Sequence, residues 1–253
     1  MDLGLTDRVY VITGGSRGLG FAAAQALVAD GARVVIAARD ADQVAAAVKD
    51  LGGPERAVGV AADNRSPDAP RRLVTAARGS FGRLDGALIS VGGPPGGSVA
   101  QMTDEHWRDA FESVFLGAVR VAVAVGAELD EGGSLAFVLS TSVRSPIADL
   151  AISNGLRPGL AGVAKSLADE LGPRGIRVNG LLPGRISTGR VRELDARSGD
   201  PETVRAELSQ RIPLRRYGGP EEFGRVAAFV LSPAASYVSG TMIAVDGGAL
   251  RAF

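Results

Sequence analysis

Short, nearly continuous hydrophobic runs alternate along the chain with longer segments in which apolar residues recur at helical spacing. Continuous apolar runs are typical of strands covered on both faces. The predicted strands are Arg8–Thr13, Arg33–Ala38, Ala57–Asp63, Gly86–Val91, Ser134–Thr141, Arg177–Leu182 and Thr241–Val245. The predicted helices cover residues 18–30, 41–51, 66–80, 103–129, 153–171 and 219–231. This alternation indicates an α/β fold with a parallel sheet and right-handed crossovers.

No internal repeat, low-complexity tract or linker divides the 253 residues, so we expect one domain over residues 1–253. Residues 185–218 carry no clear pattern. We therefore expect an irregular segment there, long enough to be a mobile flap over a substrate.

A glycine-rich turn with the sequence TGGSRGLG, residues 13–20, follows the first predicted strand and opens directly into a helix. Glycines permit a sharp turn, and a helix N-terminus presents free N–H groups to a pyrophosphate. The alternative is a turn that only packs, but the strand before it and the helix after it favour a dinucleotide site. The residues expected to hold the cofactor there are Gly14, Ser16, Arg17, Gly18, Leu19 and Gly20.

The end of the second predicted strand sets the type of cofactor. A carboxylate there would hold the ribose 2′-hydroxyl of NAD and repel a 2′-phosphate. This chain has Ala38 followed by Arg39, with Arg17 in the glycine turn. Because guanidinium groups bind phosphate bidentately, we favour NADP(H) over NAD(H). The alternative is that both arginines are solvated surface residues.

These motifs resemble the short-chain dehydrogenase/reductase family, most closely its 3-oxoacyl-acyl-carrier-protein reductase-like members, along the whole chain. TGGSRGLG matches the family's TGxxxGxG, LLPGRIST (181–188) matches its PGxxxT, and the segment ending at Gly248 matches its C-terminal region. The resemblance implies a single-domain Rossmann fold, a doubly wound seven-stranded parallel sheet with helices on both faces. It also implies cofactor contacts from Asp63 at the adenine, from Gly92 after the fourth strand, and from Pro183, Gly184 and Thr188 beside the nicotinamide.

Members of that family commonly form homodimers or homotetramers through two long helices and the last strand. Gly155, Gly159 and Gly162 recur at near-helical spacing here, and small residues let a second helix approach closely. The alternative is that these glycines pack against the chain's own fold.

The family's chemistry uses an Asn–Ser–Tyr–Lys set, and only the serine, Ser142, is retained. The tyrosine position falls on Ser153, the lysine position on Arg157 and the asparagine position on Val114. The three tyrosines, Tyr10, Tyr217 and Tyr237, lie elsewhere in the chain.

These replacements weaken acid–base chemistry, because a serine hydroxyl cannot be tuned toward working pH as a phenol can. Loss of a general acid typically lowers the rate by about 10²–10⁴. Arg157 can still donate to the ribose hydroxyls of the cofactor, but it cannot relay a proton. Pro158 disfavours helical geometry at Arg157. The candidate catalytic residues are Ser142, Ser153 and Arg157.

Other charged residues are expected near this site. Arg144, Asp149 and Arg185, together with Arg157, could form a cationic pocket for an anionic substrate or a carrier phosphopantetheine. The alternative is a set of scattered arginines on a solvated rim. His106 follows a helix N-terminal signature and is expected to begin a helix rather than act as a catalyst.

Composition excludes several classes of function. The chain has no cysteine and one histidine, which argues against disulfides and against thiolate or His-rich metal sites. With 28 basic and 28 acidic residues, nothing suggests a nucleic-acid or membrane surface. No apolar run approaches the roughly 20 residues of a membrane span, and the N-terminus lacks a basic leader. We expect a cytoplasmic protein.

Three functions are compatible with these residues. The first is an NADP-dependent oxidoreductase acting on a carbonyl or alcohol, either a small molecule or an acyl-carrier substrate, with a non-standard proton donor. The second is a non-catalytic NADP-binding sensor or assembly protein. The third is another reaction, such as dehydration or isomerisation, on the same scaffold.

Overall fold

The computed structural model describes residues 2–252 and contains a single parallel sheet. The sheet has seven strands, as predicted, and their order is β3-β2-β1-β4-β5-β6-β7. Its strands are β1 (Val9–Thr13), β2 (Arg33–Ala38), β3 (Ala57–Ala61), β4 (Gly86–Ile89), β5 (Ser134–Val138), β6 (Arg177–Pro183) and β7 (Met242–Val245).

Every neighbouring pair of strands is parallel, and apolar side chains face each other in register. Ile12 of β1 pairs with Ile36 of β2 on one side and with Leu88 of β4 on the other. All residues of β1, β4 and β5 are buried. The continuous apolar runs therefore arise because both faces of the sheet are covered.

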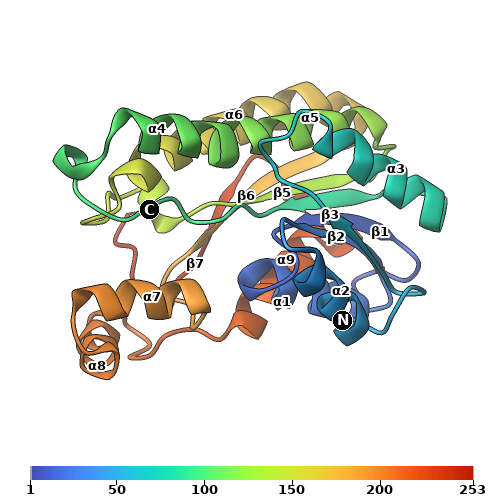
Figure 1. Cartoon of the computed structure of the whole chain (residues 1–253). Helices are drawn as coiled ribbons and strands as arrows, with labels where there is room; N and C mark the ends of the chain where they lie inside the picture. The colour runs from blue at the N-terminus through green and yellow to red at the C-terminus, as the bar shows by residue number, and fades with distance from the viewer. Residues whose placement is uncertain (1, 253) are drawn as a thin grey trace.

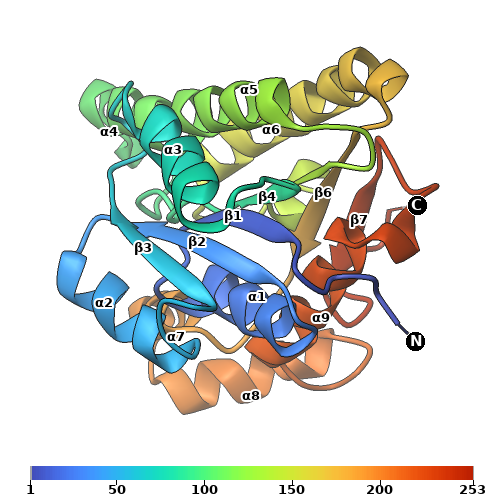
Figure 2. The same cartoon turned by 90° about the vertical axis from the view of Figure 1, so that its right-hand side faces the viewer.

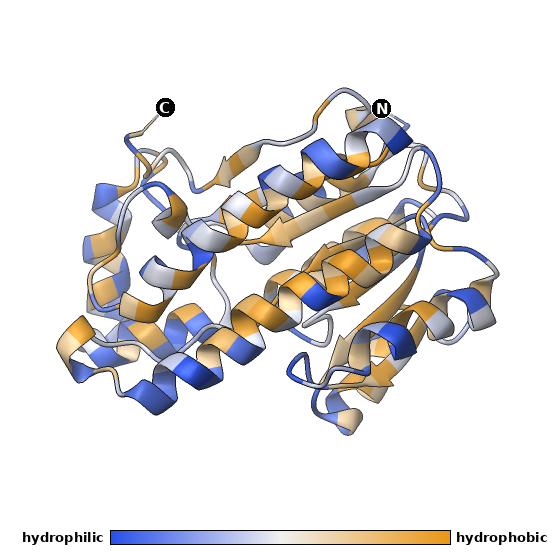
Figure 3. Cartoon of the chain, turned by 90° about the horizontal axis from the view of Figure 1, so that it is seen from above, coloured by the Kyte–Doolittle hydropathy of each residue, from blue (hydrophilic) through white to orange (hydrophobic). Residues whose placement is uncertain are grey.

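Two layers of helices cover the sheet (Figures 1 and 2). One face carries α3, α4, α5 and α6, and the other carries α1, α2 and α9. The helices are α1 (Gly18–Ala29), α2 (Ala41–Asp50), α3 (Ala69–Phe81), α4 (Asp104–Ala110), α5 (Gly117–Glu128), α6 (Ala151–Leu171), α7 (Gly189–Ser198), α8 (Pro201–Arg211) and α9 (Pro220–Leu231). Figure 3 shows the hydrophobic colouring concentrated on the strands and on the helix faces around them.

Residues 185–218 are not irregular, contrary to our expectation. They contain α7 and α8, which lie together beyond the edge of the sheet (Figure 1). The Thr188 side chain caps α7 by accepting a hydrogen bond from the Val191 N–H, and Asp200 caps α8 in the same way through Thr203. The helices escaped prediction because they are mostly polar: Asp195 is the one buried residue of α7, and α8 has none.

The predicted helix over 103–129 begins as expected, with Thr103 capping α4 and His106 in its first turn. It is interrupted by a π-helical segment, Phe111–Leu116, before α5. The whole run Asp104–Glu128 is long and apolar enough to cross a membrane by length and composition, which the sequence analysis did not anticipate. Here it packs in the layer over the sheet.

The glycines of α6 contact the chain's own helices at two of three positions. A Cβ atom on Gly155 would lie 3.0 Å from Trp107, and one on Gly159 would lie 2.9 Å from Phe115. Only Gly162 faces open space. Gly155 and Gly159 therefore let α4 and the π-helical segment approach α6 closely, although both glycines remain exposed at the surface.

Candidate active site at the carboxyl edge of the sheet

The strand order reverses between β1 and β4, which creates a crevice at the carboxyl ends of these strands. Ligands of open α/β sheets bind at such a switch point. Each predicted site residue follows the end of a strand or lies on the helix next to that edge. They are Gly14, Ser16, Arg17, Gly18, Leu19 and Gly20 after β1, Arg39 after β2, Asp63 after β3, Gly92 after β4, Ser142 after β5, Ser153 and Arg157 on α6, and Pro183, Gly184 and Thr188 at the end of β6 and the start of α7.

Glycine is required in the turn after β1 for steric reasons. Gly14 and Gly18 both have φ of 59°, in the left-handed region that favours glycine. A Cβ atom on Gly20 would lie 2.3 Å from the Gly14 carbonyl oxygen. No side chain caps the N-terminus of α1 at Arg17, so its first N–H groups remain available to an anion.

Two exposed arginines lie at the ends of β1 and β2. Within residues 2–252, neither Arg17 nor Arg39 forms an ion pair. Asp63 instead pairs with Arg65 at 2.8 Å. Hydrogen bonds from Arg65, and to a smaller degree the positive charge of Arg39, hold the pKa of Asp63 below its ordinary value. The Arg39 guanidinium, which forms no ion pair among residues 2–252, is therefore available to a ligand.

Residues on both sides of the crevice leave room for a dinucleotide. Thr13 ties β1 to β4, donating from its hydroxyl to the Ser90 carbonyl at 2.8 Å. Gly92 borders open space, since a Cβ atom there would meet nothing within 4 Å. The Thr188 methyl lies 3.9 Å from the Cβ position of Gly18, so the start of α7 covers the glycine turn. The residues present thus fit a dinucleotide cofactor.

Ser142 and Ser153 form a buried pair beside this crevice. Their Oγ atoms are 3.3 Å apart, and the two residues are 3% and 5% exposed. Ser142 lies in the turn after β5, where its backbone N–H donates to the Ser140 hydroxyl, and Ser153 lies in the first turn of α6. The fold therefore brings together two hydroxyls that are eleven positions apart in the chain.

Arg157 lies one turn after Ser153 on the same face of α6. It is 6% exposed, and its Nη1 donates to the Val138 carbonyl at 2.6 Å. Burial, and secondly the positive charge of Arg190, lowers the pKa of Arg157 to about 10. At neutral pH its guanidinium therefore remains a cation beside the serine pair. The expected distortion by Pro158 is wrong, because α6 runs without a break from Ala151 to Leu171.

Arg190, in the first turn of α7, is a candidate site residue that the sequence analysis missed. Its Nη2 donates to the Pro94 carbonyl at 2.6 Å, so α7 reaches across to the loop after β4. Arg190 could have been predicted as a site residue from its position directly after the Thr188 cap, but only if α7 had first been recognised as a helix. Asn154 was also missed; its side chain bonds both backbone groups of Ile147 and fixes the loop after Ser142.

The predicted cationic pocket of Arg144, Asp149, Arg185 and Arg157 does not form. Arg144 donates to the Met242 carbonyl in β7, and Arg185 pairs with the buried carboxylate of Asp195. The backbone of Asp149 has φ of 56°, and its carbonyl accepts the Gly97 N–H. Only Arg157 of this set lies beside the serine pair.

None of the tyrosines reaches Ser142. Tyr10 is buried in β1 with its hydroxyl on the Leu231 carbonyl, Tyr217 donates to Asp195, and Tyr237 is fully exposed. The asparagine position, Val114, is buried in the π-helical segment. Among residues 2–252 no three His, Asp or Glu side chains gather as a metal site would require.

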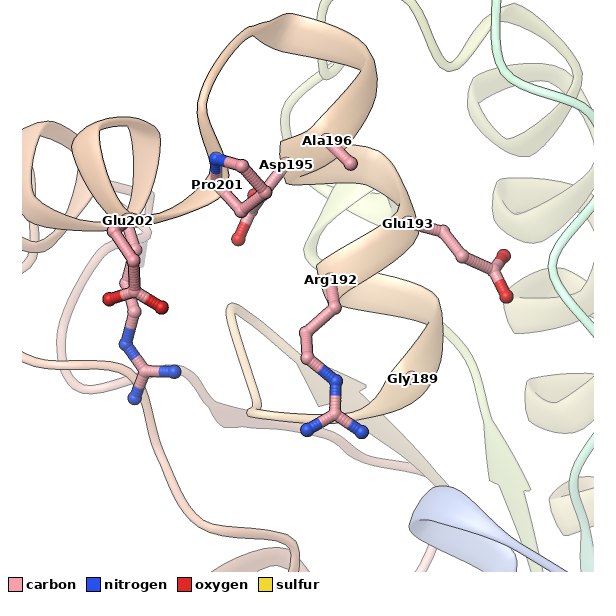
Figure 4. Close-up of a pocket in the computed structure, with 8 residues that line it drawn as sticks. Gly189, Arg192, Glu193, Asp195, Ala196, Pro201 and Glu202 are labelled. Carbon is pink, nitrogen blue, oxygen red and sulfur yellow. The ribbon is translucent and has the colours of Figure 1, made fainter.

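A separate pocket of about 450 Å³ lies between α7 and α8 (Figure 4). Its lining includes Arg192, Asp195 and Arg205, and none of Ser142, Ser153 and Arg157. It is therefore a neighbour of the candidate active site and not part of it.

The sheet order and the glycine turn define a fold of the Rossmann type. The sequence model described as enoyl-(acyl carrier protein) reductase matches residues 14–249. The chain is 32% identical over 244 residues to the 3-oxoacyl-[acyl-carrier-protein] reductase MabA of Mycobacterium bovis, covering 96% of this chain and 92% of that protein. The chain therefore belongs to the short-chain dehydrogenase/reductase family.

Solved structures agree over the full length. The L-sorbose reductase of Gluconobacter frateurii, in complex with NADPH and L-sorbose, superposes with a TM-score of 0.92 at 30% identity and full coverage of both chains. A short-chain oxidoreductase from Pseudomonas aeruginosa PAO1, described as containing an atypical catalytic center, superposes with a TM-score of 0.90 at 28% identity, again over both whole chains. These relatives are oxidoreductases, and the first was solved with a reduced dinucleotide.

Proposed function

We propose that this protein is an NADP(H)-dependent oxidoreductase that interconverts a carbonyl compound and an alcohol, with Ser142, Ser153 and Arg157 at its active site. The observation that carries the proposal is the buried Ser142–Ser153 pair beside Arg157, at the same edge of the sheet as the uncapped glycine turn. A 3-oxoacyl reductase-like substrate is supported by the resemblance to MabA.

When bound, the cofactor supplies or accepts the hydride. The hydroxyls of Ser142 and Ser153 donate hydrogen bonds to the carbonyl oxygen and hold it in place. The cationic guanidinium of Arg157 stabilises the negative charge that develops on this oxygen. Because neither serine is acidic enough to protonate an alkoxide efficiently, the proton comes from water through a serine hydroxyl, and we expect slow turnover.

The preference for NADP(H) rests on Arg17 and Arg39. Both side chains are exposed, and the residue before Arg39 is Ala38 where an NAD-specific site would have a carboxylate. The solved NADPH complex of L-sorbose reductase supports the use of this dinucleotide.

A second candidate is a non-catalytic NADP-binding protein. It is favoured by the absence of any tyrosine near Ser142 and by apolar Val114 at the asparagine position. We also propose a homodimer or homotetramer. Light scattering showing a monomer at micromolar concentration would contradict that assembly.

Two measurements on the same protein test the proposal. The first is a calorimetric titration with NADPH, and the second is NADPH consumption with a panel of ketones and aldehydes. Binding with turnover supports the oxidoreductase, and binding without any turnover supports the non-catalytic alternative. Absence of binding contradicts both.

A further inference from the structure

Two arginines without an acidic partner among the described residues line the pocket between α7 and α8. Arg192 comes from α7 and Arg205 from α8, on either side of a volume of about 450 Å³ (Figure 4). Within residues 2–252 neither side chain forms an ion pair or donates a hydrogen bond. Guanidinium groups with free N–H donors in one concave site favour a ligand that has several anionic oxygens.

Arg205 is oriented by an aromatic ring instead of a carboxylate. Its guanidinium carbon lies 5.1 Å from the centroid of the Tyr217 ring, and Tyr217 is 4% exposed. Stacking on an aromatic face restrains a guanidinium without using the N–H donors at its edge. Arg205 therefore offers these donors from a restrained position.

Asp195 supplies a buried hydrogen-bond acceptor to the same pocket. It lines the pocket although it is only 3% exposed. Its Oδ1 accepts hydrogen bonds from Arg185 and from the Tyr217 hydroxyl, whereas its Oδ2 accepts none from the described residues. No fully buried side-chain oxygen in that part of the chain lacks a partner, so Oδ2 touches accessible space, which the pocket supplies. An ionised carboxylate is an acceptor only, so a ligand must bring an O–H or N–H group to this oxygen.

The remaining acids of the pocket lining do not cancel the charge of the two arginines. Glu193 extends on the other side of α7 from Asp195 (Figure 4), and its carboxylate lies 3.7 Å from the Arg190 guanidinium. Glu202 lines the pocket and has no ion-pair partner among residues 2–252. Since Arg185 offsets the charge of Asp195, the two pocket arginines outnumber the one acid that is left, and the pocket keeps an excess of positive charge.

We propose that this pocket binds a phosphate group together with an O–H donor, either as inorganic hydrogen phosphate or as a phosphate monoester with a neighbouring hydroxyl. Arg192 and Arg205 bind the anionic oxygens, and the Asp195 Oδ2 accepts the hydrogen bond from the ligand O–H. Sulfate has a similar shape and charge but carries no hydrogen, so the Asp195 carboxylate repels it. The site is separate from the dinucleotide crevice, and the inference does not depend on the proposed oxidoreductase function.

The test compares oxyanions that have an O–H group with oxyanions that lack one. Inorganic phosphate, glycerol 3-phosphate, methyl phosphate and sulfate are titrated calorimetrically at about pH 8, where phosphate monoesters are fully ionised. The protein is first saturated with NADPH, so that the phosphates of the cofactor occupy the glycine turn. We expect inorganic phosphate to bind about 10-fold or more tightly than sulfate. Glycerol 3-phosphate should bind more tightly than methyl phosphate if the ligand is an ester, and no better if it is the free ion.

Arginine variants locate the bound phosphate. Arg192→Gln and Arg205→Gln should each weaken phosphate binding by about 10-fold or more, the loss expected of a charge-assisted hydrogen bond. Arg211→Gln is the matched control, because Arg211 is an exposed arginine of the same helix as Arg205 and does not line the pocket. It removes the same charge and should leave phosphate binding unchanged. Asp195→Asn should bind sulfate as tightly as phosphate, and the comparison on the unmodified protein decides the point if this variant does not fold.

Equal binding of phosphate and sulfate, no phosphate binding at millimolar concentration, or equal losses in the Arg205 and Arg211 variants would overturn the inference. Phosphate binding that is present in the free protein and lost on saturation with NADPH would also overturn it, by assigning the phosphate to the glycine turn. Failure of NADPH to bind would contradict the proposed function alone, because the arginine variants still locate the phosphate.

Discussion

The Oγ atoms of Ser142 and Ser153 lie 3.3 Å apart, one in the turn after β5 and the other in the first turn of α6. Ser153 falls where the resembling family has its tyrosine, and Arg157, one turn further, falls where it has its lysine. The scaffold that would present a phenol to Ser142 is therefore in place, although the phenol is absent. This arrangement allows the missing chemistry to be restored by substitution.

The double variant Ser153→Tyr and Arg157→Lys should gain reductase activity toward acetoacetyl substrates. The expected gain is about 10²–10⁴ in rate, because a phenol tuned by a cation replaces a serine as general acid. Substitution of Pro158 is unnecessary, since α6 is already helical through this residue. The measurement is NADPH consumption.

The control for that gain is Ser153→Phe with Arg157→Lys, which has the same bulk without the hydroxyl. It should show no increase. Equal rates in the Tyr and Phe variants, or family-typical turnover by the unmodified protein, would contradict the assignment of Ser153 to the acid position.

The cofactor preference should depend on Arg39. We expect NADPH to bind at least about 10-fold more tightly than NADH, because a charge-assisted phosphate contact contributes 1.4 kcal/mol or more. Arg39→Asp should reverse the order by repelling the 2′-phosphate and accepting the ribose hydroxyls. Calorimetric titration measures the dissociation constants of both cofactors. Equal affinities for NADPH and NADH in the unmodified protein would contradict the predicted preference.

Gly20 and Gly162 offer a matched test of the glycine turn, since both lie in helices. Gly20→Ala should lower the free energy of unfolding by about 1–3 kcal/mol, because its methyl would meet the Gly14 carbonyl oxygen. Gly162→Ala, in open space, should raise it by roughly 0.5–1 kcal/mol. Urea unfolding measures both values. A stabilised Gly20→Ala variant would show that the turn is looser than the structure indicates.

Most of the fold was predictable because strands buried on both faces leave continuous apolar runs in the sequence. The helices α7 and α8 were not, since they bury almost nothing and so lack an apolar stripe. The start of α8 could nevertheless have been predicted, because Asp200 followed by Pro201 is a typical helix N-terminus.

The residues of the candidate site were likewise predictable only in part. Residues such as Gly14, Gly20 and Ser142 follow strand ends, so the parallel topology brings them to one edge. The role of Arg190 depends on how α7 folds back onto Pro94, a long-range contact that no local pattern encodes. The same is true of Arg144 and Arg185, whose carbonyl and carboxylate partners become visible only in three dimensions.

Acid stability should depend on Glu222 at the start of α9. Hydrogen bonds, first from Arg216 and then from the Gly219 N–H, lower the pKa of Glu222 from 4.5 to about 2. Because the folded-state pKa is lowered, this stabilisation is fully present above pH 4.5 and is lost as the pH falls toward about 2. Glu222→Gln should therefore lower the urea midpoint at neutral pH, and its difference from the unmodified protein should disappear over that range.

The neighbouring Glu221→Gln is the control for this effect. Glu221 forms no ion pair among the described residues, so its substitution should lower the urea midpoint less than Glu222→Gln does. A pH-independent loss in Glu222→Gln would point to packing rather than to ionisation.

Hydride transfer itself is the most direct test of the proposed oxidoreductase function. Protein saturated with NADPH that carries deuterium at the reactive nicotinamide carbon is incubated for a long period with carbonyl compounds, both acids and neutral ketones, and the products are analysed by mass spectrometry. We expect a deuterated alcohol whose formation requires Ser142, and we expect it to form slowly in the unmodified protein and faster in the Ser153→Tyr and Arg157→Lys variant. Stoichiometric binding of NADPH with no deuterium in any alcohol would contradict the proposed function and leave a protein that binds the cofactor without using it.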